Sequence, residues 1–432
     1  MHRPGRRWSV VAVFFAFMLL HQSDRLLIGP LTTPIMETFG IDEAQMGAVF
    51  TGAVLVGGIL YPVWGYLYDR FARAKLLALA SFIWGCTTWL SAIAPTYPAF
   101  LATRASTGID DSAYPGLYSL VSDYFGPGLR SRVYGLIQLA QPLGYLLGMI
   151  LAMSLRDVLG WRGVFYVTGA LGILLAVAIL ATVRDVPRGR AEPEMADLAD
   201  VGVYRFERAT AWALLRKPSM LLLYVQGFFG VFPWQVITYW FFRYLETERK
   251  YAPDVVLVTM VIAVLVMASG YFVGGSLGDM LFRRTPKGRV IVASTGILLG
   301  MVFLVLAMTT PVEDYPRFLL FLTLTGLVMP FSSPNVVATI YDIAPPEVRS
   351  TALSVEYFIE QAGSATAPLL AGIIAVGSSL GTAILIICTG GWAVCGLVFL
   401  TVSFLIPRDI AALRTLMRQR ADAERSKVGV AP

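Results

Sequence analysis

Ionisable side chains interrupt two stretches of strongly apolar sequence. His21, Asp24 and Arg25 lie in one, and Arg104 and Asp111 lie in another. A charge in apolar surroundings is costly unless it has a partner or faces a wet cavity. Acids and arginines gathered in this way predict an internal site where protons are exchanged and an anionic group is held.

A carboxylate in a low-dielectric cavity favours its protonated form, and a nearby arginine reverses that preference. Opening or closing the cavity changes the balance, which is the physical basis for coupling to protons. We therefore expect Asp24 and Asp111 to exchange protons while Arg25 and Arg104 attract an anionic head group. His21, one turn before Asp24, either extends the proton path or is a hydrogen-bonded structural residue.

Helical spacing predicts how these groups are placed. Arg104, Gly108 and Asp111 lie at i, i+4 and i+7, hence on one helix face, with about 10 Å of rise between the two charges. Adjacent Asp24 and Arg25 diverge by about 100° and so engage different partners, such as Arg104 for Asp24. The alternative is a buried ion-pair network that only holds two helices together. Asp110 points away from this face, toward a neighbouring helix, and its role stays open.

The second half of the chain offers a different set of polar groups. Glu356 and Glu360 are spaced i and i+4, and we expect Glu360 to be a further proton site, with Glu356 reaching the cytoplasmic interface as the alternative. Pro334 predicts a broken helix beside Asn335. Mixed aromatic and polar side chains suit an amphipathic substrate, and those expected to bind it are Gln226, Trp234, Tyr239 and Asn335.

The elements that carry these residues are predicted to cross a membrane. The 432 residues are 56% hydrophobic and 14% charged, with mean hydropathy +0.68, whereas soluble proteins have about 25% charged residues. Runs of about 20 apolar residues span a bilayer as helices. The sequence therefore predicts an all-α membrane protein with twelve spans near 8–34, 44–68, 76–94, 98–124, 132–154, 161–183, 218–244, 254–281, 289–309, 316–341, 350–376 and 380–406.

Positive charge predicts the orientation. Of the 34 Lys and Arg, all but eight fall in segments on the same side as both termini. Six fall opposite and two lie within spans, namely Arg156, Arg162, Arg243, Arg249, Lys250 and Arg317, then Arg25 and Arg104. This asymmetry indicates cytoplasmic termini in a plasma or inner membrane, and explains the net charge of +6 without nucleic acid. The N-terminal run lacks a small-residue cleavage pattern, so we expect it to be a span and not a signal peptide.

Two related halves are visible. Gly65, Asp69 and Arg73 recur as Gly275, Asp279 and Arg283, while a second set, Asp123, Arg130, Ser131 and Gly144, recurs as Asp342, Arg349, Ser350 and Gly363. The expected organisation is a six-helix bundle over 1–183, a cytoplasmic linker over 184–217 with an amphipathic helix near 198–215, a second bundle over 218–406 and a basic cytoplasmic tail over 407–432.

At these residues the chain resembles a known family. The run from Gly65 to Arg73 is similar to the loop 2–3 signature of the major facilitator superfamily, with Ala72 where a glycine is usual. Asp24-Arg25 with Arg104-x3-Gly108-x2-Asp111 resembles both Spinster-type lysolipid transporters and anion:cation symporters. The stretches 130–132, 183–189 and 215–219 favour the Spinster type, although Asp110 and Asp111 replace its Gly and Glu.

The resemblance implies a gate at the cytoplasmic edge. Asp69 is expected to meet the positive N-terminal end of a helix from the other half, which the superfamily implies is the eleventh span, beginning near Arg349. Arg70, Arg73 and Asp279 complete the expected gate. The alternative is that these charges only fix orientation.

Enzymatic and cofactor functions are not expected. Gly274 to Gly278 matches G-x-S-x-G, but it ends an apolar helix, only His2 and His21 could serve as base, and Gly270, Gly274 and Gly278 instead form a small-residue packing ladder. The cysteines show no metal spacing, and no P-loop is present. We expect a monomeric, proton-coupled, alternating-access carrier of a lysophospholipid or related amphipathic lipid, without cofactor or metal. Alternatives are proton symport of a small organic anion such as a sugar acid, and a non-transporting receptor or lipid-binding protein.

Overall fold

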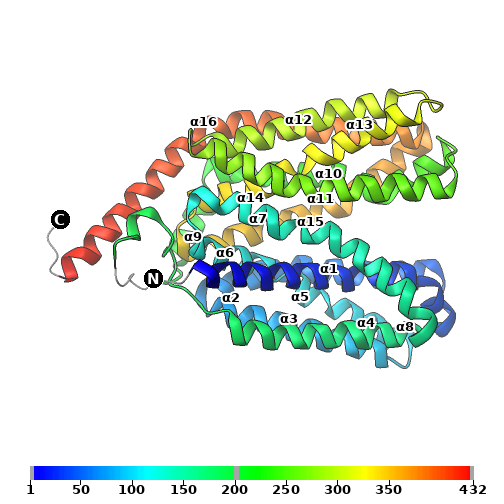
Figure 1. Ribbon diagram of the computed structural model, residues 1–432, viewed down its shortest axis with the longest axis horizontal. Coiled ribbons are helices and arrows are strands. Elements are labelled where there is room, and N and C mark those ends of the chain that lie inside the picture. The colour runs from blue at the N-terminus through cyan, green and yellow to red at the C-terminus, as the bar shows by residue number, and fades with distance from the viewer. Residues whose placement is uncertain (1–3, 199–203, 429–432) are drawn as a thin grey trace.

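Two helical bundles lie side by side in the computed structural model, which describes residues 4–198 and 204–428 (Figure 1). The first bundle contains α1 (Pro4–Phe39), α2 (Glu43–Arg70), α3 (Arg73–Ile93), α4 (Tyr97–Ser106), α5 (Gly108–Asp111), α6 (Tyr114–Tyr124), η1 (Pro127–Leu129), α7 (Arg130–Gln138) and α8 (Ala140–Thr182). No β-strand occurs within these described ranges.

The second bundle repeats this order after a linker that holds η2 (Pro193–Met195) and α9 (Arg208–Leu215). Its helices are α10 (Pro218–Thr247), α11 (Pro253–Phe282), α12 (Gly288–Thr309), α13 (Tyr315–Val328), η3 (Met329–Phe331), α14 (Ser332–Ile343), η4 (Pro346–Val348), α15 (Arg349–Gly377) and α16 (Leu380–Val428). The linker helix begins at Arg208, later than predicted, and residues 199–203 lie outside the described part of the chain.

Twelve membrane crossings follow from these elements, which confirms the predicted fold class. Within residues 4–198 and 204–428, ten segments are long and apolar enough to span a bilayer, and one of them, Pro127–Thr182, has 56 residues. Gly160 adopts a positive φ of 66° inside that segment and turns the chain back, so the segment crosses twice. The remaining crossing is the broken helix over 97–124.

Two of the crossings are broken helices. The span over 97–124, expected as one helix, is interrupted at Thr107 and again at Ser112 and Ala113. The break in the span over 315–343 was expected at Pro334. It lies about one turn earlier, at Met329–Phe331. Prolines near both breaks remove backbone donors.

Glycines let the helices approach closely. A Cβ on Gly108 would lie 2.3 Å from the Ala53 carbonyl oxygen and 2.5 Å from the Gly57 nitrogen, so α5 packs directly on α2. The predicted ladder Gly270, Gly274 and Gly278 is confirmed, because α11 uses it to pack against Leu327, Phe331 and Asn335.

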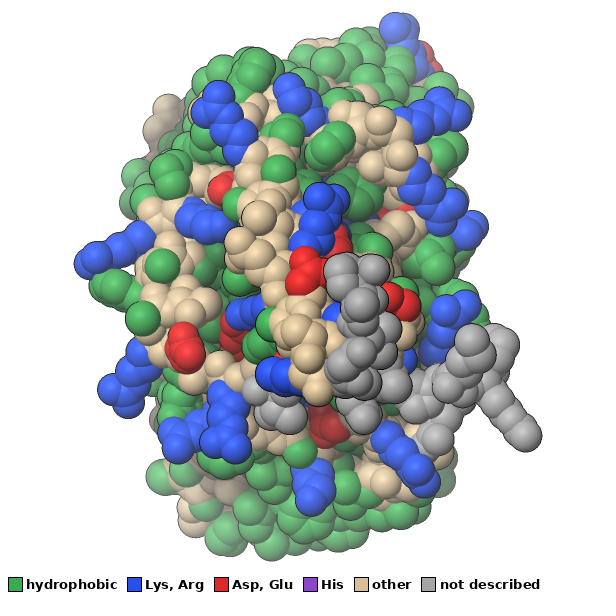
Figure 2. Space-filling view, turned by 90° about the vertical axis from the view of Figure 1, so that its left-hand side faces the viewer, with side chains coloured by type: hydrophobic (Ala, Val, Ile, Leu, Met, Phe, Trp, Pro, Cys, Tyr) green, Lys and Arg blue, Asp and Glu red, His purple; other side chains and the backbone are tan. Residues whose placement is uncertain are grey.

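Both termini and the linker lie at one end of the molecule, which we call the linker face (Figure 1). Lys and Arg side chains are spread over this face and protrude at its margins, with acidic side chains between them (Figure 2). The last turns of α16 extend beyond the bundles and pack on the linker through a small apolar cluster of Met195, Leu198, Leu413, Met417 and Ala421.

Candidate functional site

The first candidate site is a buried cluster between α1 and α5. His21 Nε2 lies 2.7 Å from a carboxylate oxygen of Asp110 and 3.6 Å from one of Asp111. Its Nδ1 is 2.5 Å from the Tyr114 hydroxyl, so both ring nitrogens are engaged. His21 and Asp110 are almost fully buried. The structure therefore gives Asp110, whose role the sequence left open, a definite place as the histidine's partner.

The charges around this cluster form two pairs. Arg25 Nε lies 3.8 Å from Asp111, and the Arg25 side chain is 38% exposed. Arg104 Nη1 lies 4.0 Å from Asp24, and both side chains are buried. Asp24 also accepts a hydrogen bond from Thr88 at 3.1 Å, and the Arg104 guanidinium stacks over Phe165. Arg25 is thus placed to meet a solute, whereas Arg104 is enclosed with Asp24.

His21, Asp110 and Asp111 offer atoms within 4.8 Å of one another, a set that could hold a divalent cation. The 2.7 Å contact from His21 Nε2 to Asp110 is shorter than the spacing of two ligands around a metal of about 3.3 Å. A proton shared between imidazole and carboxylate accounts for the contact without an ion.

The second bundle places its predicted residues differently. Both amide hydrogens of buried Asn335 are donated to backbone carbonyls, of Gly274 at 2.9 Å and Phe331 at 2.8 Å. Gln226 is buried against α16, with Cys395 Sγ 3.5 Å from its backbone carbonyl oxygen. Both amide side chains are therefore enclosed by helix packing in this conformation, and their binding of substrate stays a prediction. Trp234 is half-buried in α10, and the side chain of Tyr239 lies outside the described residues.

Glu360 and Glu356 lie one turn apart on α15. Glu360 is half-buried, whereas Glu356 is 1% exposed. The suggestion that Glu356 reaches the cytoplasmic interface is wrong, because its carboxyl group packs on the backbone of Gly227 in α10. Beside Glu360, the ring of Tyr357 lies 5.5 Å from that of Tyr61, whose hydroxyl donates to the Asp111 carbonyl oxygen at 3.2 Å. Tyr61 and Tyr357 thus connect the acids of the two bundles.

The second candidate site is at the linker face, where each bundle caps a helix of the other. The Asp69 carboxylate accepts hydrogen bonds from the backbone N–H groups of Ser350 at 3.0 Å and Thr351 at 2.6 Å, at the start of α15. Asp279 accepts in the same way from Ser131 at 3.2 Å and Arg132 at 2.8 Å, at the start of α7. Helix N-termini favour such carboxylates because their first N–H groups lack partners.

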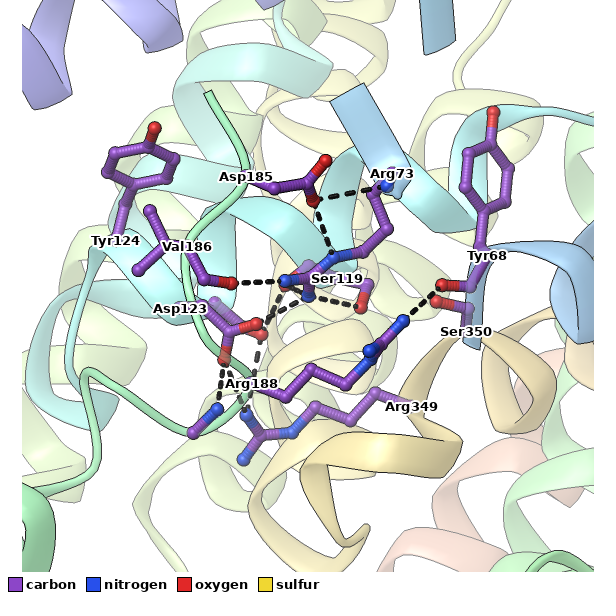
Figure 3. Close-up of polar contacts among 12 residues, drawn as sticks. Tyr68, Arg73, Ser119, Asp123, Tyr124, Asp185, Val186, Arg188, Arg349 and Ser350 are labelled. Carbon is purple, nitrogen blue, oxygen red and sulfur yellow. Dashed lines mark hydrogen bonds and ion pairs between the residues drawn. The ribbon is translucent and has the colours of Figure 1, made fainter. Parts of the chain in front are cut away.

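Buried arginines tie these caps to a second layer of acids. Arg73 pairs with Asp123 and donates to the Val186 carbonyl oxygen at 2.7 Å, as Figure 3 shows. Arg289 pairs with Asp342 and lies 2.6 Å from Asp279. Arg289, and not the predicted repeat partner Arg283, is therefore the counterpart of Arg73. Arg283 is exposed and donates to the Gly128 carbonyl oxygen at 3.0 Å.

Glu192 of the linker lies between the two bundles and was missed by sequence reasoning. One carboxylate oxygen lies 2.6 Å from Arg130 of the first bundle and 2.5 Å from Arg349 of the second, and the other lies 2.7 Å from Arg414 of α16. Arg349 also lies 3.6 Å from Asp123 and Arg130 lies 3.4 Å from Asp342. We call this set the clasp, comprising Asp69, Arg73, Asp123, Arg130, Glu192, Asp279, Arg289, Asp342 and Arg349.

Arg70, a predicted gate residue, is not part of the clasp. Its side chain is exposed and contacts Tyr66 and Phe71 of its own segment. It sits on the outer surface of α2, one residue after Asp69 and therefore turned by about 100° from it.

Close packing at Gly65 depends on the clasp being closed. A Cβ at this position in α2 would lie 2.4 Å from Ser354 Oγ and 3.1 Å from the Ser350 carbonyl oxygen of α15. We expect Gly65→Ala to shift the protein toward a state open at the linker face, by about 1–3 kcal/mol. Spin-label distances across that face measure the shift. Gly58→Ala is the matched control, since its Cβ would meet Gln361 at 3.8 Å, an ordinary contact. Equal distances in both variants would contradict the expectation.

Two bundles of six crossings, joined by reciprocal caps at one end and carrying buried charges between their helices, define a secondary transporter. The chain belongs to the major facilitator superfamily, whose profile matches residues 13–312. It is 26% identical over 395 residues to human protein spinster homolog 1, covering 86% of this chain and 73% of that protein. It is 28% identical over 384 residues to Drosophila melanogaster protein spinster, covering 85% of this chain and 62% of the relative.

Solved structures share the fold. The human organic anion transporter MFSD10 (TETRAN) superposes with a TM-score of 0.70 at 19% identity, covering 94% of this chain and all of that one. A bacterial homolog of the human lysosomal transporter Spinster, inward-facing and occupied, gives 0.57 at 18% identity, covering 98% of each chain. The predicted resemblance to the superfamily and to its Spinster members is confirmed. The protein is a Spinster-like multi-pass transporter and not an enzyme.

Proposed function

We propose that this protein is a proton-coupled carrier that works by alternating access and transports a lysophospholipid or related amphipathic anion. The observation that carries the proposal is the position of Asp111, 3.6 Å from His21 and 3.8 Å from Arg25. One carboxylate thus borders both the shared proton and the exposed cation. Acids in such positions within membrane helices are commonly functional.

The arrangement supplies a coupling mechanism. An anionic head group that binds Arg25 competes with Asp111 for the guanidinium. Asp111 then loses its cation, which favours uptake of a proton. Proton and anion therefore bind together at one place, and the clasp keeps the linker face closed while they do. Aromatic side chains on α10 and α15, including Trp234, Tyr357 and Phe358, offer apolar surface for an acyl chain.

The orientation and setting follow from the charges. We place the linker face in the cytoplasm, because lysine and arginine are concentrated there (Figure 2). The protein would then act as a monomer in a plasma or inner membrane, with lipids, protons and the substrate as its partners. No cofactor is required by this mechanism. The same proposal includes the domain organisation. The first bundle ends at residue 183, the second begins at residue 218, and a cytoplasmic segment begins at residue 407.

A second candidate is proton symport of a small organic anion such as a sugar acid. The observation that favours it is the likeness in fold to a transporter described as carrying organic anions. A single exposed arginine beside a carboxylate would serve either kind of anion. Transport accounts for the titrating groups between the bundles better than a receptor or lipid-binding role does, since binding alone requires no proton exchange.

The experiment is uptake by purified protein in proteoliposomes, with lysophospholipids and sugar acids offered in parallel, with and without a pH gradient. We expect a pH gradient to drive accumulation of a lysophospholipid. Asp111→Asn should lower that accumulation at least tenfold, while counterflow exchange remains. Asp157→Asn is the control, because that carboxylate is 78% exposed and pairs only with neighbouring Arg156 at 3.3 Å among the described residues. Accumulation of sugar acids alone would favour the second candidate. If the pH gradient changes the uptake of neither solute, proton coupling is refuted.

A further inference from the structure

A cluster of buried polar side chains that the coupling mechanism does not use lies inside the second bundle, between α10, α15 and α16. Its centre is Glu356, which is 1% exposed. Neither of its carboxylate oxygens has a hydrogen-bond partner among the described residues. The hydroxyl of Tyr224 and the side-chain oxygen of Gln226, both on α10, are also buried without partners. The unpartnered side-chain atoms of these three residues are therefore all oxygens.

The packing around Glu356 is tight. A Cβ on Gly227 would lie 2.4 Å from the Glu356 Oε1 and 3.4 Å from the Glu360 Cγ, so the absence of a side chain at 227 makes room for the carboxyl group. Cys395 of α16 lies beside Gln226, with its Sγ 3.5 Å from the Gln226 backbone carbonyl oxygen. The titratable groups that face Glu356 are Glu360 on its own helix, Tyr224 on α10 and Cys395 on α16. No described Lys or Arg forms an ion pair with it.

An ionised carboxylate in this position would have neither a cation nor a donor to stabilise it, inside a membrane helix. A neutral carboxylic acid carries its own O–H donor and needs far less. The unpartnered acceptors on Gln226 and Tyr224 are the kind of group such a donor would use. The contacts thus fit a Glu356 that holds a proton in this conformation.

We propose that Glu356 is a second proton-binding site, built into the second bundle, and that Glu360 exchanges its proton with the space between the bundles. Glu360 lies one turn along α15 and is half-buried. It adjoins Tyr357, whose ring meets Tyr61, and Tyr61 contacts Asp111 of the first bundle. The two proton sites therefore lie on either side of one pair of tyrosines. Loss of the Glu356 proton would place a bare charge between α10 and α15 and loosen their contact.

The role of Glu356 in transport rests on the proposed proton coupling. Protonation of Glu356 can be tested without transport. Infrared spectra of the full chain in lipid at about pH 7 should contain the carbonyl band of a protonated carboxylic acid in a dry site. We expect Glu356→Gln to remove one component of that band, which Glu360→Gln should retain. Glu356→Gln should fold as stably as the parent, since an amide mimics the neutral acid. A band that Glu356→Gln leaves unchanged, or a variant that fails to fold, would overturn the proposal.

Transport gives the second readout. If Glu356 carries one of the coupled protons, the accumulation ratio in Glu356→Gln should fall about tenfold for each pH unit of gradient, while some gradient dependence remains. An unchanged ratio would reject that role. Sodium binding that removes the infrared band, and is lost in Glu356→Gln, would identify a sodium site and overturn the proton assignment. If the parent shows the band but no gradient-driven uptake, the proposed function fails and the protonated Glu356 stands.

Discussion

Glu192→Gln is expected to open the linker face. The substitution keeps the shape of the side chain. It removes the only negative charge in the described part of the chain that forms ion pairs with both Arg130 of one bundle and Arg349 of the other. Both guanidinium groups are fully buried. Removal of one partner from a buried ion pair typically costs about 3 kcal/mol or more. We therefore expect the ratio of closed to open molecules to fall about 100-fold.

Spin-label distances between α2 and α15 at the linker face measure this ratio. Glu194→Gln is the matched control. Glu194 also meets Arg414, at 3.0 Å, but its described ion-pair contacts do not extend to Arg130 or Arg349. If Glu192→Gln and Glu194→Gln give the same distance distribution, the linker carboxylate does not hold the clasp.

The same residue predicts how the clasp responds to pH. Burial alone would raise the pKa of Glu192, but the charges of Arg130, Arg349 and Arg414 outweigh it and hold the pKa below its ordinary value of 4.5. A carboxylate with a lowered pKa adds stability above its ordinary pKa, and that stability is lost only as the pH falls through the lowered value. Acidification from about pH 7 to about pH 5 should therefore change the free energy of clasp opening by the same amount in the parent and in Glu192→Gln, because Glu192 stays ionised across this range. A pH response that is lost in Glu192→Gln would contradict this assignment.

Arg104→Gln and Asp24→Asn are each expected to destabilise the protein by about 3 kcal/mol, and the double variant by much less. The two side chains lie 4.0 Å apart and are buried, with an Asp24 oxygen and an Arg104 nitrogen left without hydrogen-bond partners. Either single change leaves one charge uncompensated between α1 and α4. Removing both charges together leaves two neutral amides that can bond to each other.

Thermal unfolding in detergent, compared across the four proteins, gives the coupling between the two positions. Arg156→Gln with Asp157→Asn provides the exposed reference pair, 3.3 Å apart, for which we expect under about 0.5 kcal/mol. If the losses of stability in Arg104→Gln and Asp24→Asn add up in the double variant, the ion pair is not the source of stability. Arg104 would then be free to bind the substrate directly, as the sequence analysis expected.

Features with a regular pattern could be predicted from the sequence. The spans follow from hydropathy, because about 20 apolar residues have few alternatives to a membrane helix. The positions of Asp69 and Asp279 follow from the repeat and from the affinity of helix N-termini for carboxylates. Asp24 and Arg104 were also expected to meet.

Features that depend on contacts between distant segments could not be predicted. Glu192 lies in a polar linker with several other acids, and nothing in its neighbourhood marks it as the one that enters the interface. Arg289 replaces Arg283 because the turn between α11 and α12 differs in length from that between α2 and α3. Asn335 looks like a solute ligand by composition, yet it donates both amide hydrogens to backbone carbonyls of packed helices. Which face of a helix a polar residue occupies is decided by tertiary packing.

The capping contacts at the linker face have a consequence for sequence comparison. Asp69 and Asp279 bind backbone N–H groups, and every residue except proline supplies one. These hydrogen bonds therefore require no particular side chain at positions 131, 132, 350 and 351, proline excepted. Methods that infer contacts from correlated substitutions would find no correlation here, although these contacts join the two bundles. The acids would look isolated in an alignment even though each holds a helix of the opposite bundle.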